Sequence, residues 1–261
     1  MAGLQRYMAA LRLFNEAQPT WTVHEMAEAL GAPQSTVYRT IRDLLAEGLV
    51  EASTDARYRL GPAFIEFDRL TRLTDPLLRA GAHVLEQTVV QAGAPCVGLL
   101  SRLYADEVMC IADRASGDVG FSPSYERGRP MPLTQGATSK VILARLPARR
   151  LSKLLTHAGK GEDAALRAEL AMIRRQGFLV SRGEIDAGLA GLAAPIVCEE
   201  AGLVASLSLV VEAERLDGFT ESRLVLMLVS AAAMVERALR AQNNMPVIAT
   251  SEATKQSRSL P

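Results

Sequence analysis

The chain has 261 residues, of which 49% are hydrophobic and 22% are charged, and its 29 basic residues balance its 29 acidic residues. This length and composition fit a soluble globular protein with two ordinary domains. The charge balance excludes a uniformly basic polyanion-binding protein, although it allows a local basic patch. The longest nearly apolar stretch, residues 224–235, is too short for a membrane span, which needs about 20 residues. Because the N-terminus also lacks the apolar core of a signal peptide, we expect a cytoplasmic protein without a membrane partner.

The first sixty residues carry three helical patterns. Helical spacing of apolar residues predicts a first helix over about residues 4–16. Thr22, with a glutamate three residues later, is a capping-box pattern that begins a short second helix ending at Gly31. A third helix is expected to begin at Pro33 and to end at Gly48. Three helices joined by tight turns predict a helix-turn-helix.

Two short strands are expected after the third helix. They span residues 49–52 and 57–60, on either side of a turn. A β-hairpin in this position adds a wing to the helix-turn-helix. We therefore predict a winged helix-turn-helix domain over residues 1–62, followed by a linker helix over residues 63–75.

The third helix carries side chains that suit contact with bases. Residues 33–42 include hydroxyls, an amide and two guanidinium groups but no acid, and such a helix fits the major groove, which is about 12 Å wide. Arg39 and Arg42 lie one turn apart, so one can reach a guanine and the other a phosphate, in either assignment. Arg57 and Arg59 alternate along the wing and are expected to face the flanking backbone. The predicted DNA contacts are Thr22, Gln34, Ser35, Thr36, Tyr38, Arg39, Arg42, Arg57 and Arg59.

The charge of this domain bears on its oligomeric state. Residues 1–60 contain six arginines and seven acidic residues, so a single copy gains little from releasing counterions from DNA. Useful affinity for a double-stranded DNA operator then needs two or more copies, which predicts a homodimer or tetramer. A winged helix that contacts only proteins is the alternative.

Residues 76–242 are expected to form the second domain, in which helical and strand patterns surround a loop region at residues 113–132. This pattern predicts a mixed α/β sheet with helices packed on it, and an α+β fold for the chain. Residues 243–261 are polar and predict a disordered tail. The expected helices span residues 76–92, 136–146, 164–176 and 222–240, and the expected strands span residues 95–101, 107–112, 192–197 and 203–211.

Two features of the second domain indicate a ligand site. Gly136 and Ala137 open a helix, whose free amides and partial positive charge favour a carboxylate, although an ordinary helix start has the same pattern. Ser206 and Ser208 point to one side of an otherwise apolar strand and need partners if buried, from a ligand or from neighbouring backbone. The loop expected to cover this pocket carries Val119, Phe121 and Met131.

The acidic residues and the cysteines of the second domain allow other functional interpretations. Glu184 and Asp186 lie in a Gly-rich turn, where they are either solvated, or bind a ligand amine, or hold a metal with Cys198 or His157. No metal-ligand spacing supports the last option, so neither metal nor cofactor is predicted. The three cysteines are widely spaced, form no CxxC pair and sit in apolar strand contexts, so inert thiols in a reducing compartment are expected. They are Cys96, Cys110 and Cys198.

Several of these segments resemble the IclR family of bacterial transcriptional regulators. The resemblance covers about residues 5–240 and implies a GAF-like, PAS-like effector domain, a dimer or tetramer, and control of a catabolic operon by a small acid. Ser139 departs from the family's usual glycine, which we expect to alter packing rather than abolish the site. The resembling segments are residues 33–39, 44–50, 57–61, 136–140, 174–178 and 188–196.

The resemblance also implies ligand-contact positions, which here hold Ser181, Gly191, Ser208 and Val210. Two of these lack a polar side-chain group, so a larger, partly apolar acid, such as an aromatic one, is our hypothesis. The chain is thus predicted to be an effector-responsive repressor or activator. A cysteine-based redox sensor and an enzyme are the alternatives, but no common catalytic motif occurs and no catalytic residue is predicted.

Overall fold

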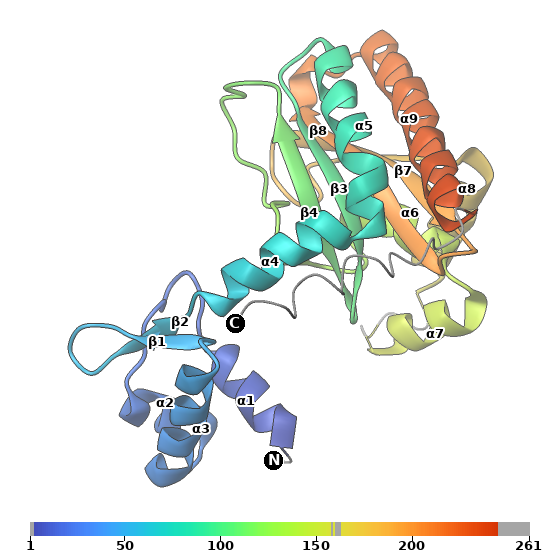
Figure 1. Ribbon diagram of the computed structural model, residues 1–261. Helices are drawn as coiled ribbons and strands as arrows, with labels where there is room; N and C mark the ends of the chain where they lie inside the picture. The colour runs from blue at the N-terminus through green and yellow to red at the C-terminus, as the bar shows by residue number, and fades with distance from the viewer. Residues whose placement is uncertain (1–2, 158, 160–162, 245–261) are drawn as a thin grey trace, which may run out of the picture. The chain divides into compact units, whose positions relative to one another are not determined.

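Figure 1 shows the computed structural model of the chain. The described residues are 3–157, 159 and 163–244. The chain divides into two compact units, Met1–Thr74 and Asp75–Pro261. In the described part of the chain, no helix combines the length and the apolar content of a membrane span.

The first unit is a three-helix body with a two-stranded antiparallel wing. Its α2 begins as predicted, because the Thr22 hydroxyl accepts from the Glu25 amide at 3.2 Å and the Glu25 carboxylate accepts from the Thr22 amide at 2.8 Å. Gly31 ends α2 with a φ of 58°. Its elements are α1 (Gly3–Leu11), α2 (Val23–Leu30), α3 (Gln34–Ala46), β1 (Val50–Ala52), β2 (Tyr58–Leu60) and α4 (Ala63–Thr74). This order is the predicted winged helix-turn-helix, with the predicted linker helix after it.

The first helix is shorter than predicted. It ends at Leu11 rather than near residue 16, because Asn15 folds the following chain into a turn. The Asn15 side-chain oxygen accepts from the amides of Ala17 and Gln18 at 3.0 and 2.9 Å. Such side-chain bonds compete with helix continuation.

The second unit contains a six-stranded antiparallel sheet in the order β5-β4-β3-β8-β7-β6. The strands are β3 (Val97–Tyr104), β4 (Glu107–Ala115), β5 (Pro130–Met131), β6 (Leu179–Arg182), β7 (Leu189–Cys198) and β8 (Leu203–Glu212). Strand β6 pairs only with the first half of β7, up to Ala193. Beyond it stand Pro195, which has no amide hydrogen, and Val197, whose amide donates to the Glu236 carboxylate at 2.7 Å.

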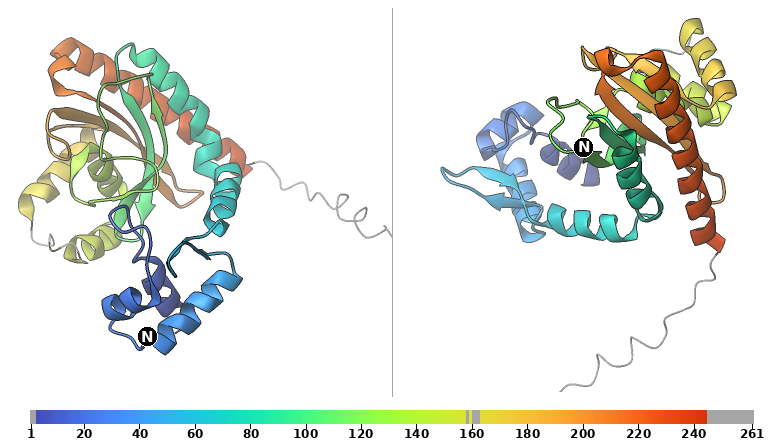
Figure 2. Two further views of the ribbon diagram at one scale, coloured as in Figure 1. Left: turned by 90° about the vertical axis from the view of Figure 1, so that its left-hand side faces the viewer. Right: turned by 90° about the horizontal axis from the view of Figure 1, so that it is seen from above.

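Helices cover both faces of the sheet (Figures 1 and 2). The apolar side chains of α5 and α9 pack on one face, and those of α6, α7 and α8 pack on the other. Strand β8 alternates as predicted, because Leu207 and Leu209 face α5 and α9 while Val210 packs with α6. The helices are α5 (Pro76–Ala92), α6 (Gly136–Arg145), α7 (Ala148–His157), α8 (Ala164–Gln176) and α9 (Gly218–Asn244), with a short 3-10 helix at Ala213–Arg215.

Three elements of the second unit, α7, β6 and α9, also differ from the sequence prediction. Helix α7 was not expected, since only three leucines of its ten residues face the core. Strand β6 was also missed, because four residues before a Gly-rich turn give too short a pattern. Helix α9 continues to Asn244, so a disordered tail beginning at residue 243 is wrong for its first two residues. Residues 245–261 of that predicted tail lie outside the described residues.

Candidate functional site

A small cavity lies at the N-terminal end of α6, beside β6, β7 and β8. Its volume of about 30 Å³ holds roughly two water molecules. Most of its wall is regular structure, and the rest is the turn between β6 and β7 together with Tyr125 of the segment between β4 and β5. The cavity is lined by Tyr125, Gly136, Ala137, Thr138, Ser181, Gly183, Glu184, Ile185, Asp186, Leu189, Gly191 and Val210.

Five of the ten predicted ligand residues line this cavity. They are Gly136, Ala137, Ser181, Gly191 and Val210. Ser208 stands one step behind the wall, where its hydroxyl accepts from the Thr138 hydroxyl at 3.0 Å. The structure thus brings six of the predicted residues together, while their contact with a ligand stays a prediction.

The other four predicted ligand residues lie away from the cavity wall. Ser206 is fully buried on β8, opposite Ser101 of β3, and its hydroxyl has no hydrogen-bond partner among the described residues. Val119 and Phe121 are half-buried against the α6 side of the sheet, and Met131 is buried in β5. Their side chains support the walls rather than forming them.

The first turn of α6 requires a glycine and directs its backbone amides toward the cavity end of the helix. Gly136 has a φ of +76°, and a Cβ atom there would lie 2.9 Å from Cγ1 of Ile185. The next amide, of Ala137, donates to the Ser181 hydroxyl at 3.1 Å. This turn is therefore an anion-compatible helix end that the chain's own side chains cover.

Tyr125 is a polar wall residue that sequence reasoning missed. Its hydroxyl lies 2.7 Å from the Ser139 hydroxyl, which donates to the Pro132 carbonyl at 2.7 Å. Because Ser139 has one hydrogen, Tyr125 is the donor of this pair. Burial raises the pKa of Tyr125 to about 12, which keeps it protonated. Ser139 therefore anchors the wall and leaves the cavity intact.

Lys140 is buried directly beneath the cavity. It is 7% exposed, and its Nζ lies 2.5 Å from Glu184 and 3.0 Å from Glu169. Burial by itself lowers the pKa of Lys140, but the hydrogen bonds that Lys140 donates to Glu184 and Glu169 outweigh burial and hold that pKa above its usual value. Because Lys140 already binds two carboxylates, its charge serves to stabilise the fold.

The two acidic residues of the Gly-rich turn fasten it in place. Glu184 binds Lys140, and the Asp186 carboxylate accepts from the Ser124 amide at 2.9 Å and from the Ser124 hydroxyl. Neither Cys198 nor His157 lines the cavity. Among the described residues, no group of three or more metal-ligating side chains is placed to hold an ion.

The cysteines lie in the core. All three are fully buried, and burial raises the pKa of Cys96 and raises that of Cys110 to about 12. A reactive cysteine needs an accessible thiolate. Their placement therefore gives no support to redox sensing.

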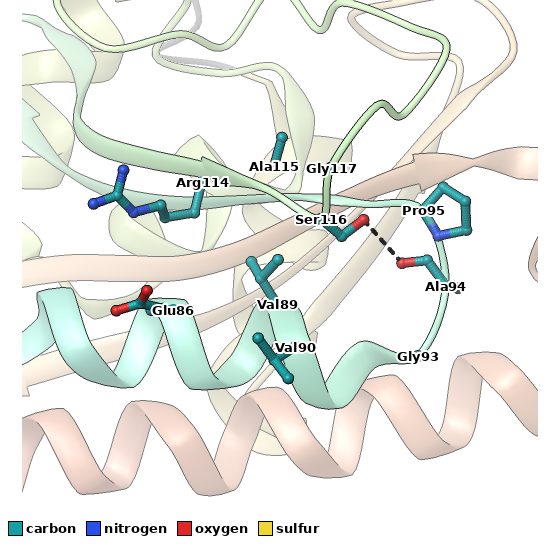
Figure 3. Close-up of a pocket in the computed structure, with 10 residues that line it drawn as sticks. All are labelled: Glu86, Val89, Val90, Gly93, Ala94, Pro95, Arg114, Ala115, Ser116 and Gly117. Carbon is teal, nitrogen blue, oxygen red and sulfur yellow. Dashed lines mark hydrogen bonds between the residues drawn. The ribbon is translucent and has the colours of Figure 1, made fainter.

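A larger hollow of about 560 Å³ lies elsewhere, between the end of α5 and the end of β4 (Figure 3). Its wall is mostly apolar, and the Ser116 hydroxyl drawn there donates to the Ala94 carbonyl. Polar groups do not converge on it as they do at the end of α6. It contains none of the predicted ligand residues.

In the first unit, α3 presents the predicted contact face. Gln34, Ser35, Tyr38, Arg39 and Arg42 are exposed, and Thr36 is half-buried. The opposite face packs into the core through residues that include Val37 and Ile41. The polar face is thus available for a partner.

The remaining predicted DNA contacts take part in the fold. Arg57 donates to both Glu25 carboxylate oxygens, at 2.6 and 3.1 Å, which ties the wing to α2. Arg59 donates to Glu51 of the neighbouring strand at 2.6 Å. Thr22 caps α2 with its hydroxyl. Contact of these three residues with DNA stays a prediction.

Two family models match the chain. The IclR helix-turn-helix domain matches residues 3–53, and the C-terminal domain of the bacterial transcriptional regulator IclR matches residues 83–237, more than half of the chain. The chain belongs to the IclR family. The first unit is the DNA-binding domain of that family, and the second is its GAF- or PAS-like effector domain.

Individual regulatory proteins are similar in sequence to this chain over most of their length. An HTH-type transcriptional regulator of Mycobacterium tuberculosis, Rv1719, is 32% identical over 208 residues, covering 74% of this chain and 76% of that protein. The glycerol operon regulatory protein of Streptomyces griseus is 29% identical over 92% of this chain and 96% of its own. These relatives are transcriptional regulators.

Solved structures share the fold. An IclR-type regulator from Silicibacter sp. TM1040 has a TM-score of 0.77 at 22% identity, covering 90% of this chain and 95% of that chain. An IclR homologue from Microbacterium hydrocarbonoxydans, crystallised with 4-hydroxybenzoate, has a TM-score of 0.74 at 24% identity, covering 91% and 99% of the two chains.

Proposed function

We propose that this IclR-family protein is a cytoplasmic, effector-responsive repressor or activator of a catabolic operon, which binds a small carboxylate at the N-terminal end of α6. One observation carries this proposal. Gly136, Ala137 and Ser181 line a cavity that has an apolar wall at Val210, and the Ala137 amide at this helix start donates to the Ser181 hydroxyl at 3.1 Å. Amides at a helix start favour an anion, and an apolar wall favours a carbon skeleton. That a homologue was crystallised with 4-hydroxybenzoate supports the same ligand class.

For the DNA partner, we propose that α3 enters the major groove of a double-stranded operator. Its exposed face carries an amide, hydroxyls and two guanidinium groups, and the one acidic residue of the helix, Asp43, pairs with Arg42 at 3.3 Å. Arginine contacts to guanine are the commonest specific contacts in that groove. The protein then acts by binding rather than by catalysis.

We further propose that the operator is bound by a homodimer or tetramer. Helix α4 leaves apolar side chains exposed along its length, with Ile65 at 74% exposure, Phe67 at 54% and Leu73 at 57%. Several exposed apolar side chains along one helix are typical of an interface with another copy. Two DNA-binding domains also compensate for the low positive charge of one.

The test is a gel retardation assay with duplex DNA from the region upstream of the protein's own gene. Arg39→Ala should lower operator affinity at least about tenfold, because each good base contact contributes about 1–3 kcal/mol. The same variant should keep its thermal shift with 4-hydroxybenzoate. Arg12→Ala, an exposed arginine outside α3, is the matched control and should bind DNA like the wild type.

Two results would reject the proposal. If Arg39→Ala retards the DNA as well as the wild type, α3 is not the recognition helix. If no member of a panel of carboxylic acids shifts the melting temperature or alters retardation, the end of α6 is not an effector site.

A further inference from the structure

The chain's own side chains occupy the anion-compatible end of α6. Ile185 lies over Gly136, so closely that an added Cβ would stand 2.9 Å from its Cγ1 and 3.4 Å from its Cδ1. The Ser181 hydroxyl accepts a hydrogen bond from the Ala137 amide at 3.1 Å. The Ile185 side chain therefore lies where the apolar body of an acid would lie, and the Ser181 hydroxyl lies where its carboxylate would lie.

The space that remains is too small for such an acid. The cavity of about 30 Å³ holds roughly two water molecules, and an aromatic acid is several times larger. Part of the wall has to yield before an acid of this size can enter. Most of the wall belongs to α6, β6, β7 and β8 of the second unit, and Tyr125, which is buried, is fixed by its bond to Ser139.

The remaining part of the wall, the turn of residues 183–188, is the part that can move. Gly183 has a φ of +63° and Gly188 a φ of +79°, and a Cβ at either glycine would meet no atom within 4 Å. Glycine at both ends lets the backbone rotate without steric cost. Most residues of this turn are exposed, whereas Ile185 points inward.

The side chains of two acidic residues hold the turn closed, and its base is closed by backbone hydrogen bonds from the Gly183 amide to the Leu189 carbonyl and from the Ala213 amide to the Gly188 carbonyl, both at 2.8 Å. Glu184 binds Lys140 at 2.5 Å, and Asp186 accepts from the Ser124 amide at 2.9 Å. When Glu184 leaves, Lys140 keeps Glu169 at 3.0 Å. Opening of the turn therefore leaves the buried charge of Lys140 with a carboxylate partner.

We propose that Ile185 is a specificity-determining plug, which an effector must displace from Gly136 while its carboxylate replaces the Ser181 hydroxyl on the Ala137 amide. This inference rests on the proposed effector site at the end of α6. Displacement exposes Ile185 to water, so the site favours acids whose apolar body compensates for that loss. Closed and open positions of residues 183–188 then set the apparent affinity.

Calorimetric titration of the full chain with 4-hydroxybenzoate and with pyruvate tests the plug. Ile185→Ala should bind 4-hydroxybenzoate about tenfold more tightly than the wild type, because less apolar surface is exposed on opening. The gain should be smaller for pyruvate, which fills less of the vacated space. Ile185→Val should give an intermediate gain. Val204→Ala, at a half-buried residue of the same cluster that does not line the cavity, should stay within about twofold of the wild type.

Hydrogen exchange gives a second readout in the wild type. Saturation with 4-hydroxybenzoate should speed exchange of the amides of residues 183–188, because the turn leaves its closed position. Slower exchange would mean a turn that closes over the ligand, and weaker binding by Ile185→Ala would mean that Ile185 contacts it. Either result overturns the plug and leaves the effector site standing. Failure of both acids to bind either protein overturns the effector site as well.

Discussion

The first turns of α3 and α6 differ in how they are covered. In α3, Gln34, Ser35, Tyr38 and Arg39 reach outward from a core-packed helix. In α6, every residue from Gly136 to Ala144 is buried. A partner can reach α3 without disturbing the domain, whereas a partner of α6 has to replace contacts that the domain already makes. Substitutions at the end of α6 should therefore change stability and binding together, while substitutions on α3 should change binding alone.

The largest stability effect is expected at Lys140. Lys140→Met removes the cation between Glu169 and Glu184 and should destabilise the second unit by about 2–3 kcal/mol. The figure is below that for a fully buried pair, because these carboxylate side chains are 32% and 30% exposed. Arg72→Met, which breaks the exposed pair with Asp68, is the control and should cost about 0.5 kcal/mol or less. Equal losses in urea unfolding would contradict the buried role of Lys140.

A smaller effect is expected at Gly136. Gly136→Ala forces a side chain into a left-handed conformation and against Ile185, and should cost about 2 kcal/mol. Gly188→Ala has a similar φ of +79° but open space around the new Cβ, so it should cost about 1 kcal/mol. The difference measures the contact with Ile185 alone. If the double variant Gly136→Ala/Ile185→Ala recovers no stability over Gly136→Ala, that contact is not as close as described.

The smallest effect concerns pH and the first unit. The Thr22 amide and then Arg57 lower the pKa of Glu25 below its usual 4.5. A carboxylate with a depressed pKa in the folded state stabilises that state above pH 4.5, and this contribution fades as the pH falls through the lowered pKa. Glu25→Gln should therefore make unfolding of the first unit less dependent on pH between that lowered pKa and about pH 5. Parallel stability curves for the variant and the wild type over this range would refute the assignment.

Local patterns predicted much of the fold. The capping box at Thr22 and the glycine at Gly31 placed both ends of α2, because each acts through bonds within a few residues. The alternation along β8 assigned its two faces correctly. The end of α1 was missed, since it depends on a side-chain turn at Asn15 that competes with the helical pattern.

The candidate site was predicted less completely, because long-range packing builds it. Gly136 and Ala137 carry a local signal, but Ile185 and Tyr125 reach the cavity only through the folded sheet. Ser206 was grouped with Ser208 from strand alternation, yet neither lines the cavity, and only Ser208 bonds to a residue that does, Thr138. The pairing of Arg57 with Glu25 joins residues 32 positions apart, which no short pattern reveals.

The half of β7 that β6 leaves uncovered bears on solubility. An exposed strand edge is a template for pairing with other chains, as in aggregates. Here Pro195 supplies no donor, and the next outward amide, of Val197, is already taken by Glu236. An incoming strand would find no free amide hydrogen at these two positions. The uncovered half of β7 is therefore a poor template for pairing with a strand of another chain.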